Sequence, residues 1–194
     1  MDYCKPYAII AQIFFCVRIV NQFTANVPGK ASMKKYLICS DIHRRVERLK
    51  EILKKEKGLD GIIIAGDIEA DSDEIRQLAG ETPVYMVAGN CDSWWGEDLP
   101  SLITIPACGH RIMVTHGHRY SVPYLNRLAE KAREKKADIV IFGHTHCHFM
   151  KKEDGILFLN PGAIRGCRDT GRPSYCLMVL GDDGKIHVRK KEFR

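Results

Sequence analysis

Five short apolar segments of this chain are each followed at once by residues that can ligate a metal ion or move a proton. The set contains two aspartates, one asparagine and four histidines: Asp41, His43, Asp67, Asn90, His116, His144 and His146. In an α/β sheet, ligands bind in the crevice beyond the carboxyl ends of the strands. We therefore expect the apolar segments to be strands that deliver these side chains to one edge of the fold.

The chemistry of this set favours transition-metal ions. Carboxylate, amide and imidazole groups supply oxygen and nitrogen donors, and the set contains no thiolate. Seven ligands are too many for one such ion, but they suit two ions that share a bridging carboxylate about 3.5–4 Å apart. The pattern predicts two divalent ions, with Mn²⁺ favoured over Ni²⁺, Co²⁺, Fe and Zn²⁺.

The spacing of these residues supports a common site. Asp41 and His43 are two residues apart, as are His144 and His146, so in extended backbone each pair points to one side. A glycine precedes three of the seven residues, which removes a Cβ atom where several backbones must approach one centre (Gly66, Gly89 and Gly143). A single His or Asp at a strand end is usually a turn or cap residue, but turns have no reason to select four histidines.

The elements that must position these residues follow an alternating order. Apolar periodicity predicts strands over 36–39, 61–65, 84–87, 102–105, 111–115, 139–142, 156–159, 175–180 and 185–190, and helices over 44–57, 72–79 and 122–136. The strand–helix–strand–helix–strand start indicates an α/β fold with right-handed crossovers and helices on the faces of a sheet. Three histidines outside the motifs are read as surface or strand residues: His110, His148 and His187.

Composition fits one globular domain. The 194 residues are 45% hydrophobic and 28% charged, with a net charge of +6 that is too diffuse to indicate nucleic acid. The eight cysteines form no Cys-x-x-Cys pair, so we expect neither a structural zinc site nor a disulfide framework, and we predict a cytoplasmic protein.

The residue pattern of the first 32 positions differs from that of the rest of the chain. Their apolar stretch over 7–20 is interrupted by Gln12 and Arg18, is too short to span a bilayer comfortably and lacks a clean signal-cleavage site. A membrane-surface anchor and a signal segment stay open, but we prefer a dispensable extension over 1–32 and a single domain over 33–194. We expect no stable membrane insertion.

The ordered motifs resemble those of the calcineurin-like metallophosphoesterase superfamily, over roughly residues 35–180. They are Asp41-x-His43, Gly66-Asp67, Gly89-Asn90-Cys91-Asp92, His116-Gly117-His118 and Gly143-His144-Thr145-His146. The short domain, the Cys in the third motif and Asn160-Pro161-Gly162 resemble the small bacterial and archaeal phosphodiesterase branch.

The resemblance implies a fold and a set of ligands. The fold would be a four-layer α/β/β/α sandwich of two mixed sheets, with the metal site at the carboxyl ends of the strands. Asp41, His43, Asp67 and His146 would hold one ion. Asp67, Asn90, His116 and His144 would hold the other, so that Asp67 bridges the two. Asn160-Pro161-Gly162 would have a structural role.

The function that this resemblance implies is hydrolysis of a small phosphodiester by a hydroxide bridging the two ions. Asp67, Asn90 and His116 would act through the metals, and Cys91 and His118 are further catalytic candidates. Cys91 replaces the histidine that protonates the leaving group in phosphatase branches, and a thiol is a poor general acid at neutral pH. A phosphomonoesterase with the same centre is the first alternative.

A second alternative is a non-catalytic scaffold like the retromer subunit that shares this fold. Its motifs are degraded, whereas every ligand position is filled here. Trp94 and Trp95 follow the third motif and suit either stacking on an aryl group or self-association, so a homo-oligomer stays open. Specific binding of nucleic acid is not expected, because the basic runs lie on a helix end and a terminal strand.

Overall fold

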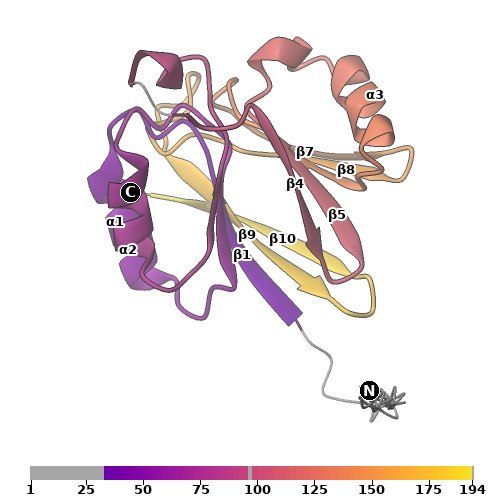
Figure 1. The fold of residues 1–194 in the computed structure, drawn as a ribbon, viewed down its shortest axis with the longest axis horizontal. Helices are drawn as coiled ribbons and strands as arrows, with labels where there is room; N and C mark the ends of the chain where they lie inside the picture. The colour runs from indigo at the N-terminus through magenta and orange to yellow at the C-terminus, as the bar shows by residue number, and fades with distance from the viewer. Residues whose placement is uncertain (1–32, 96–97, 194) are drawn as a thin grey trace, which may run out of the picture.

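Two five-stranded mixed sheets pack face to face in the computed structural model, which describes residues 33–95 and 98–193 (Figure 1). The first sheet has the order β10 (Ile186–Glu192), β9 (Ser174–Gly181), β1 (Met33–Cys39), β2 (Gly61–Ile64) and β3 (Val84–Met86). The second has the order β4 (Leu102–Ala107), β5 (His110–Thr115), β6 (Ile139–Ile141), β8 (Ile156–Pro161) and β7 (His148–Glu153).

Helices cover the outer face of each sheet, which completes four layers. Helices α1 (Val46–Lys55) and α2 (Ser72–Ala79) pack on the first sheet, and α3 (Asn126–Glu134) packs on the second (Figure 1). Two short 3₁₀ turns, η1 (Asp92–Trp95) and η2 (His118–Tyr120), follow β3 and β5. The α/β/β/α sandwich that the resemblance implied is therefore confirmed.

The apolar strand sequences follow from burial on both faces. Successive side chains of a strand point to opposite sides, so Ile63 joins the core between the sheets while Ile62 and Ile64 join the core under α1 and α2. All three isoleucines are buried, as expected for parallel strands covered on both sides. The second sheet behaves in the same way, because Ile141 faces the first sheet and Val140 packs towards α3.

Helices α1 and α3 are shorter than periodicity predicted, whereas α2 is not. Helix α2 has the predicted bounds, because Asp71 accepts a hydrogen bond from the N–H of Asp73 at its start and Gly80 caps its end. Helix α1 spans residues 46–55 instead of 44–57, since Arg44 adopts a φ of 66° that no helix tolerates. Helix α3 begins at Asn126 instead of residue 122, since the chain before it forms turns.

Strand β7 was missed by the sequence analysis. Its sequence HFMKKE has no alternation of apolar and polar residues, because it is an edge strand with little burial. The signal that could have found it is Asp154-Gly155, which joins β7 to β8. Both residues have positive φ, 49° and 80°, as a tight hairpin turn requires.

The parallel strands bring their carboxyl ends to one edge of the sandwich. β1, β2 and β3 are parallel in the first sheet, as are β5, β6 and β8 in the second, and the loops after them gather at the top of Figure 1. The proposed extension over 1–32 lies outside the described residues. None of the helices in the described part of the chain has the length and apolar content that a bilayer crossing requires.

Candidate metal centre

The loops after β1 and β2 run side by side and are joined by main-chain hydrogen bonds. The N–H of Asp41 donates to the carbonyl of Gly66 at 3.0 Å, and the N–H of His43 donates to the carbonyl of Asp67 at 3.0 Å. The three site residues on these loops have positive φ values, 52° for Asp41, 45° for His43 and 51° for Asp67. Left-handed backbone at non-glycine residues costs free energy and concentrates at functional sites.

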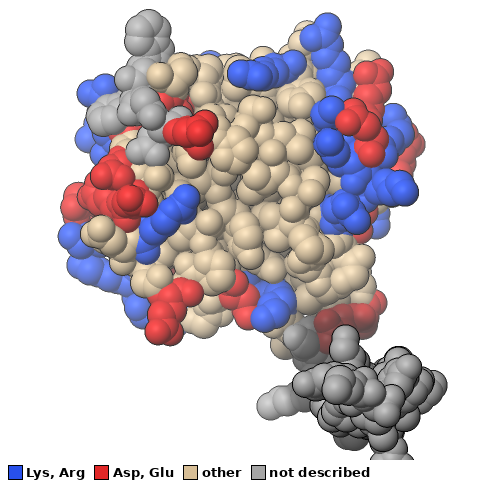
Figure 2. Space-filling view, in the orientation of Figure 1, with Lys and Arg blue, Asp and Glu red and all other residues tan. Residues whose placement is uncertain are grey.

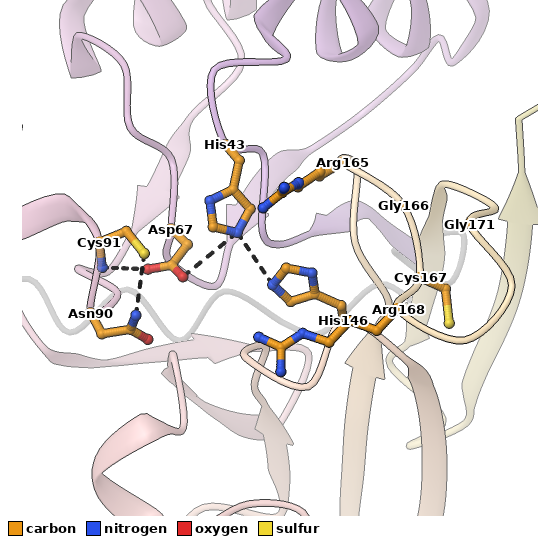
Figure 3. A pocket seen from close by; sticks show the side chains of 10 residues that line it. All are labelled: His43, Asp67, Asn90, Cys91, His146, Arg165, Gly166, Cys167, Arg168 and Gly171. Atoms are coloured by element: carbon orange, nitrogen blue, oxygen red, sulfur yellow. Dashed lines mark hydrogen bonds and ion pairs between the residues drawn. The ribbon is translucent and has the colours of Figure 1, made fainter.

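Four of the predicted ligands converge on one point. Ligand atoms of Asp41, His43, Asp67 and His146 all lie within 4.8 Å of one another. The Nε2 atom of His146 is 3.1 Å from Oδ1 of Asp41 and 3.2 Å from Nε2 of His43. Figure 3 shows His43 next to both Asp67 and His146, with dashed lines that join its ring to each of them.

The other predicted ligands are less closely gathered. Nε2 of His116 lies 3.3 Å from Oδ2 of Asp67, and the ring centroids of His116 and His144 are 5.2 Å apart. Asn90 is exposed, and its Nδ2 donates to Sγ of Cys91 at 3.2 Å. Asp67 thus lies between a compact group of side chains and a looser one.

Two buried atoms of the centre lack a hydrogen bond. Oδ1 of Asp41 and Nε2 of His116 are enclosed and make none with the part of the chain that the structure describes, although an ionisable neighbour lies near each. The other nitrogen of His116 is engaged, because its Nδ1–H donates to the carbonyl of Ala65 at 2.7 Å. An imidazole held this way presents its free nitrogen to a metal, so the donor set fits a divalent cation.

Glycines make the convergence sterically possible, as predicted. A Cβ atom on Gly89 would overlap the carboxylate of Asp67, and one on Gly143 would overlap Oγ of Ser40. Ser40 in turn donates to Oδ2 of Asp41 at 2.7 Å, so the space left by Gly143 is used to orient a predicted ligand.

The electrostatics of Asp67 favour its charged form. Burial alone would raise the pKa of this carboxyl. The neighbouring His116, together with the N–H of Cys91 that donates to Oδ1 at 2.8 Å, instead holds the pKa of Asp67 well below its usual range. Asp67 is therefore a carboxylate at neutral pH, which is the state that a bridging ligand needs.

The backbone conformation of the two i, i+2 pairs differs from the predicted extended one. Asp41 and His43 do point to one place, but through left-handed backbone and not through extended strand. His144 and His146 separate: His146 lies against Asp41, while the ring of His144 neighbours that of His116. Both histidines have positive φ, 69° and 62°, which rules out the extended geometry assumed from spacing.

A cavity of about 500 Å³ opens over the compact group. One wall is a loop that the sequence analysis did not single out, and its residues are Arg165, Gly166, Cys167, Arg168 and Gly171. In Figure 3, Arg165 extends towards His43, and the guanidinium group of Arg168 lies beside His146. Only the fold brings this wall to the motifs, since the loop follows β8, more than seventy residues after the third motif.

Two further residues hold the loops of the site in place. The buried carboxylate of Asp92 accepts hydrogen bonds from the N–H groups of Ile68, Glu69 and Gly89 at 2.7–2.8 Å. Because its oxygens are committed to the main chain, Asp92 is not free to orient a side chain at position 91. Asn160 is also buried, and it donates to the carbonyl of Gly143 at 2.8 Å, which supports the structural role expected for it.

Glu69 is a positioning residue that the sequence analysis missed. One of its carboxylate oxygens contacts Nδ1 of His43, and the other lies 3.3 Å from Nε of Arg44. A carboxylate on one imidazole nitrogen fixes the ring and raises the basicity of the other nitrogen. The available signal was its place two residues after Asp67.

Family comparison agrees with the ordered motifs and the fold. Residues 34–183 match the model of the calcineurin-like phosphoesterase superfamily domain. The chain belongs to this superfamily. Its members use divalent metals, in keeping with the donor set described above. The chain is 36% identical over 149 residues to YsnB, a probable metallophosphoesterase of Bacillus subtilis. The alignment covers 76% of this chain and 85% of that protein.

Two other proteins resemble this chain, one in sequence and one in fold. Phosphodiesterase YfcE of Escherichia coli K12 is 26% identical over 153 residues, covering 68% of this chain and 80% of that protein. The structure of Vacuolar Protein Sorting 29 from Cryptosporidium parvum superposes with a TM-score of 0.66 at 21% identity, covering 83% of this chain and 98% of that one. At that identity, the second likeness concerns the fold alone.

Proposed function

We propose that this phosphoesterase hydrolyses phosphodiesters with two divalent ions that share Asp67. The observation that carries the proposal is the convergence of four ligand atoms beneath a cavity, with two buried acceptor atoms of the centre left without hydrogen bonds among the described residues. Such a site matches metal-assisted hydrolysis better than a structural role, because structural metal sites are closed.

The ligand assignment follows the two groups of side chains. Asp41, His43, Asp67 and His146 would hold one ion, and Asp67, Asn90, His116 and His144 the other. When bound, the ions supply Lewis acidity and a water activated near neutral pH. Mn²⁺ remains our prediction for the metal, because the donors are carboxylate, amide and imidazole.

The chain itself contributes substrate binding. Arg165 and Arg168 line the cavity, and guanidinium groups bind phosphate oxygens with paired hydrogen bonds. A phosphodiester carries one negative charge, which two arginines and the metal cluster can neutralise. We propose that these arginines hold the phosphate over Asp67 and add to the stabilisation of charge in the transition state.

The environment of Cys91 supports diesters over monoesters. Burial, followed by the charge of Asp67, raises the pKa of the Cys91 thiol to about 12. A thiol that holds its proton so strongly is a weak general acid, so poor leaving groups gain little help. We therefore prefer diesters with good leaving groups, and a monoesterase with the same centre stays the alternative.

His118 is a secondary candidate for a role in the site. Its ring centroid lies 5.4 Å from that of His116 and 6.2 Å from that of His144. Burial, followed by the charge of His116, lowers the pKa of His118 below its ordinary value. A neutral imidazole beside the second group would orient substrate without competing with the cations.

Surface charge argues against a specific nucleic-acid partner. Basic side chains gather over the α3 flank in Figure 2, where acidic residues accompany them. Lys131 pairs with Glu134 at 2.7 Å and Arg133 with Asp154 at 2.8 Å, so much of this charge is neutralised locally. The partner we propose is a small phosphoester, and we propose that the protein acts in the cytoplasm.

A homo-oligomer involving Trp94 and Trp95 stays a prediction, because their side chains lie outside the described residues.

The test is hydrolysis after the metal has been removed and restored. Metal-stripped protein should be inactive on aryl and nucleotide mono- and diesters, and Mn²⁺ should restore the diester reaction best. Elemental analysis should find two ions per active chain. Full activity with one ion would refute the dinuclear centre. Stable metal-free protein without any hydrolysis after all ions are tried would favour the scaffold alternative.

A further inference from the structure

Two cysteines meet at the wall of the cavity. Sγ of Cys147 lies 3.1 Å from Sγ of Cys167, in direct contact. Cys147 follows His146 in the loop after β6, and Cys167 lies between Arg165 and Arg168. Both side chains are partly exposed, so small reagents can reach them. Neither the superfamily motifs nor the proposed hydrolysis uses this pair.

The loop that carries Cys167 lies outside the helices and strands. Residues 162–173 follow β8 and contain neither element. The N–H of Cys167 donates to the carbonyl of Arg172 at 3.0 Å, and the N–H of Gly171 donates to the carbonyl of Cys167 at 2.8 Å. A disulfide has an S–S length of about 2.05 Å, so the sulfurs must approach by about 1 Å.

The surroundings of Cys167 favour its thiolate. Burial raises the pKa of this thiol, but the hydrogen bond with Cys147 and the N–H groups of Thr170 and Asp169 lower it below its ordinary value. Among the six cysteines of the described residues, the other shifted ones have raised pKa values, and Cys39 and Cys176 are fully buried. Thiolate character and access together control the reactivity of a cysteine.

We propose that Cys147 and Cys167 are a thiol–disulfide pair that low-molecular-weight disulfides such as oxidised glutathione oxidise reversibly. The Cys167 thiolate attacks one sulfur of oxidised glutathione, forming a mixed disulfide and releasing one glutathione thiolate, which takes up a proton. Cys147 then loses its proton and attacks Sγ of Cys167, displacing the second glutathione. In total, two protein thiols and one oxidised glutathione give one protein disulfide and two reduced glutathiones.

A metal site at this pair is the weaker interpretation. Asp169 adds a carboxylate oxygen 3.3 Å from Sγ of Cys147, which makes three ligands among the described residues. A closed zinc site has four, and two thiolates on one tetrahedral zinc lie about 3.8 Å apart with the ion between them. Here the two sulfurs contact each other directly.

The cross-link would join the Arg165–Arg168 segment to the residue after His146. It would therefore fix one wall of the cavity relative to a proposed metal ligand. A cytoplasmic disulfide of this kind is typically transient and sensitive to the redox state. The formation of the bond does not depend on the proposed phosphodiesterase activity, so the two proposals fail separately.

The test is an equilibrium with glutathione followed by peptide mapping. Full-length reduced protein is incubated with graded ratios of oxidised to reduced glutathione, alkylated and digested with trypsin. The expected product joins the peptide of residues 137–151 to that of residues 166–168. It should appear at a ratio about tenfold lower than any adduct on Cys108, and dithiothreitol should remove it.

Single-cysteine variants separate the role of Cys167, which attacks glutathione, from that of Cys147, which then closes the disulfide. Cys147→Ser should accumulate a glutathione adduct on Cys167 and no cross-link. Cys167→Ser should lose the cross-link, and Cys108→Ser should behave like the wild type. The proposal is overturned if both thiols stay reduced at ratios that modify Cys108. It is also overturned if purified protein holds a zinc ion that protects both thiols and that Cys167→Ser loses.

Discussion

The two groups of side chains on either side of Asp67 differ in how firmly the fold holds them. On one side, Asp41, His43 and His146 bring their ligand atoms within 4.8 Å of Asp67. On the other, His116 is within 3.3 Å of Asp67, but Asn90 points its amide at Cys91 and is exposed. The compact group is preformed, whereas the looser group lacks an assembled set of donors.

The difference has a structural cause. Asp41, His43 and Asp67 lie on two adjacent loops whose backbones are joined by main-chain hydrogen bonds, and Ser40 and Glu69 hold the side chains of Asp41 and His43. Asn90 lies in the turn after β3, where Asp92 anchors the main chain, and its amide donates to Sγ of Cys91. We infer that the compact group binds its ion more tightly, and that Asn90 must rotate to complete the second group.

The largest effect is expected from Asp67→Ala, because Asp67 belongs to both groups. Loss of the shared carboxylate should remove several kcal/mol of transition-state stabilisation, which corresponds to about 10³-fold or more in kcat/KM. Steady-state hydrolysis of an aryl diester measures this loss. Elemental analysis should find fewer than two ions per chain. Turnover near that of the wild type would contradict a bridging role.

A pair of variants separates the two groups. Asp41→Asn should weaken the tighter of two metal-binding steps, and Asn90→Ala should weaken only the looser one, each by about tenfold or more. Calorimetric titration of metal-stripped protein with Mn²⁺ measures both steps. If Asn90→Ala weakened the tighter step instead, the order of binding inferred from the geometry would be wrong.

A smaller effect is expected from Glu69→Gln, which tests positioning within the compact group. Glutamine keeps the shape but removes the charge that faces Nδ1 of His43. Metal affinity at the tight step should fall by about 10–100-fold, as for other partners of ligating histidines. The looser step should be unchanged, and Glu69→Asp should restore part of the affinity. An equal loss at both steps would indicate a general structural defect.

The compact group was well predicted from the sequence because its residues directly follow apolar strands. The predicted ends of β1, β2 and β6, at residues 39, 65 and 142, lie within one residue of the observed ends, and the ligands lie within a few residues of them. What the pattern could not give was the backbone conformation. Positive φ at Asp41 and His43 arises from contact between the two loops, which spacing along one chain does not encode.

The wall of the cavity and the positioning residues were not predicted, for the same physical reason. Arginine is a common residue on protein surfaces, so the sequence around Arg165 and Arg168 carries no special signal. Only the pairing of β8 with β6 places these two residues at the site. In the sequence, Asp92 is one more polar residue of the third motif. In the structure, its carboxylate accepts hydrogen bonds from three main-chain N–H groups. Both depend on tertiary contacts.

Cys91 offers a finer test at the edge of the looser group. Cys91→Ser should change diester hydrolysis by less than about threefold, because neither side chain is an efficient acid near neutral pH. Cys91→His should help substrates with poor leaving groups most. Loss of activity in Cys91→Ser with both ions bound would make this cysteine catalytic.

The smallest effect on activity is expected far from both groups, at Glu56. This buried carboxylate accepts hydrogen bonds from Tyr175 at 2.8 Å and from Lys191 at 2.7 Å. Burial raises the pKa of Glu56, but these two partners and the charge of Lys35 lower it below its ordinary value overall. The stabilisation is present above the unfolded-state pKa of about 4.3 and is lost as the pH falls through the lower folded-state pKa.

Glu56→Gln should therefore lower the free energy of unfolding at pH 7 by about 1.5–3 kcal/mol, the range for hydrogen bonds to charged groups. The difference from the wild type should shrink as the pH falls below about 4, where the wild-type carboxylate also becomes neutral. Urea unfolding at several pH values measures it. Metal binding and hydrolysis at neutral pH should be unchanged, since Glu56 ends α1 and does not line the cavity. A change in metal affinity would mean that the compact group depends on the packing beneath α1 as well as on its own loops.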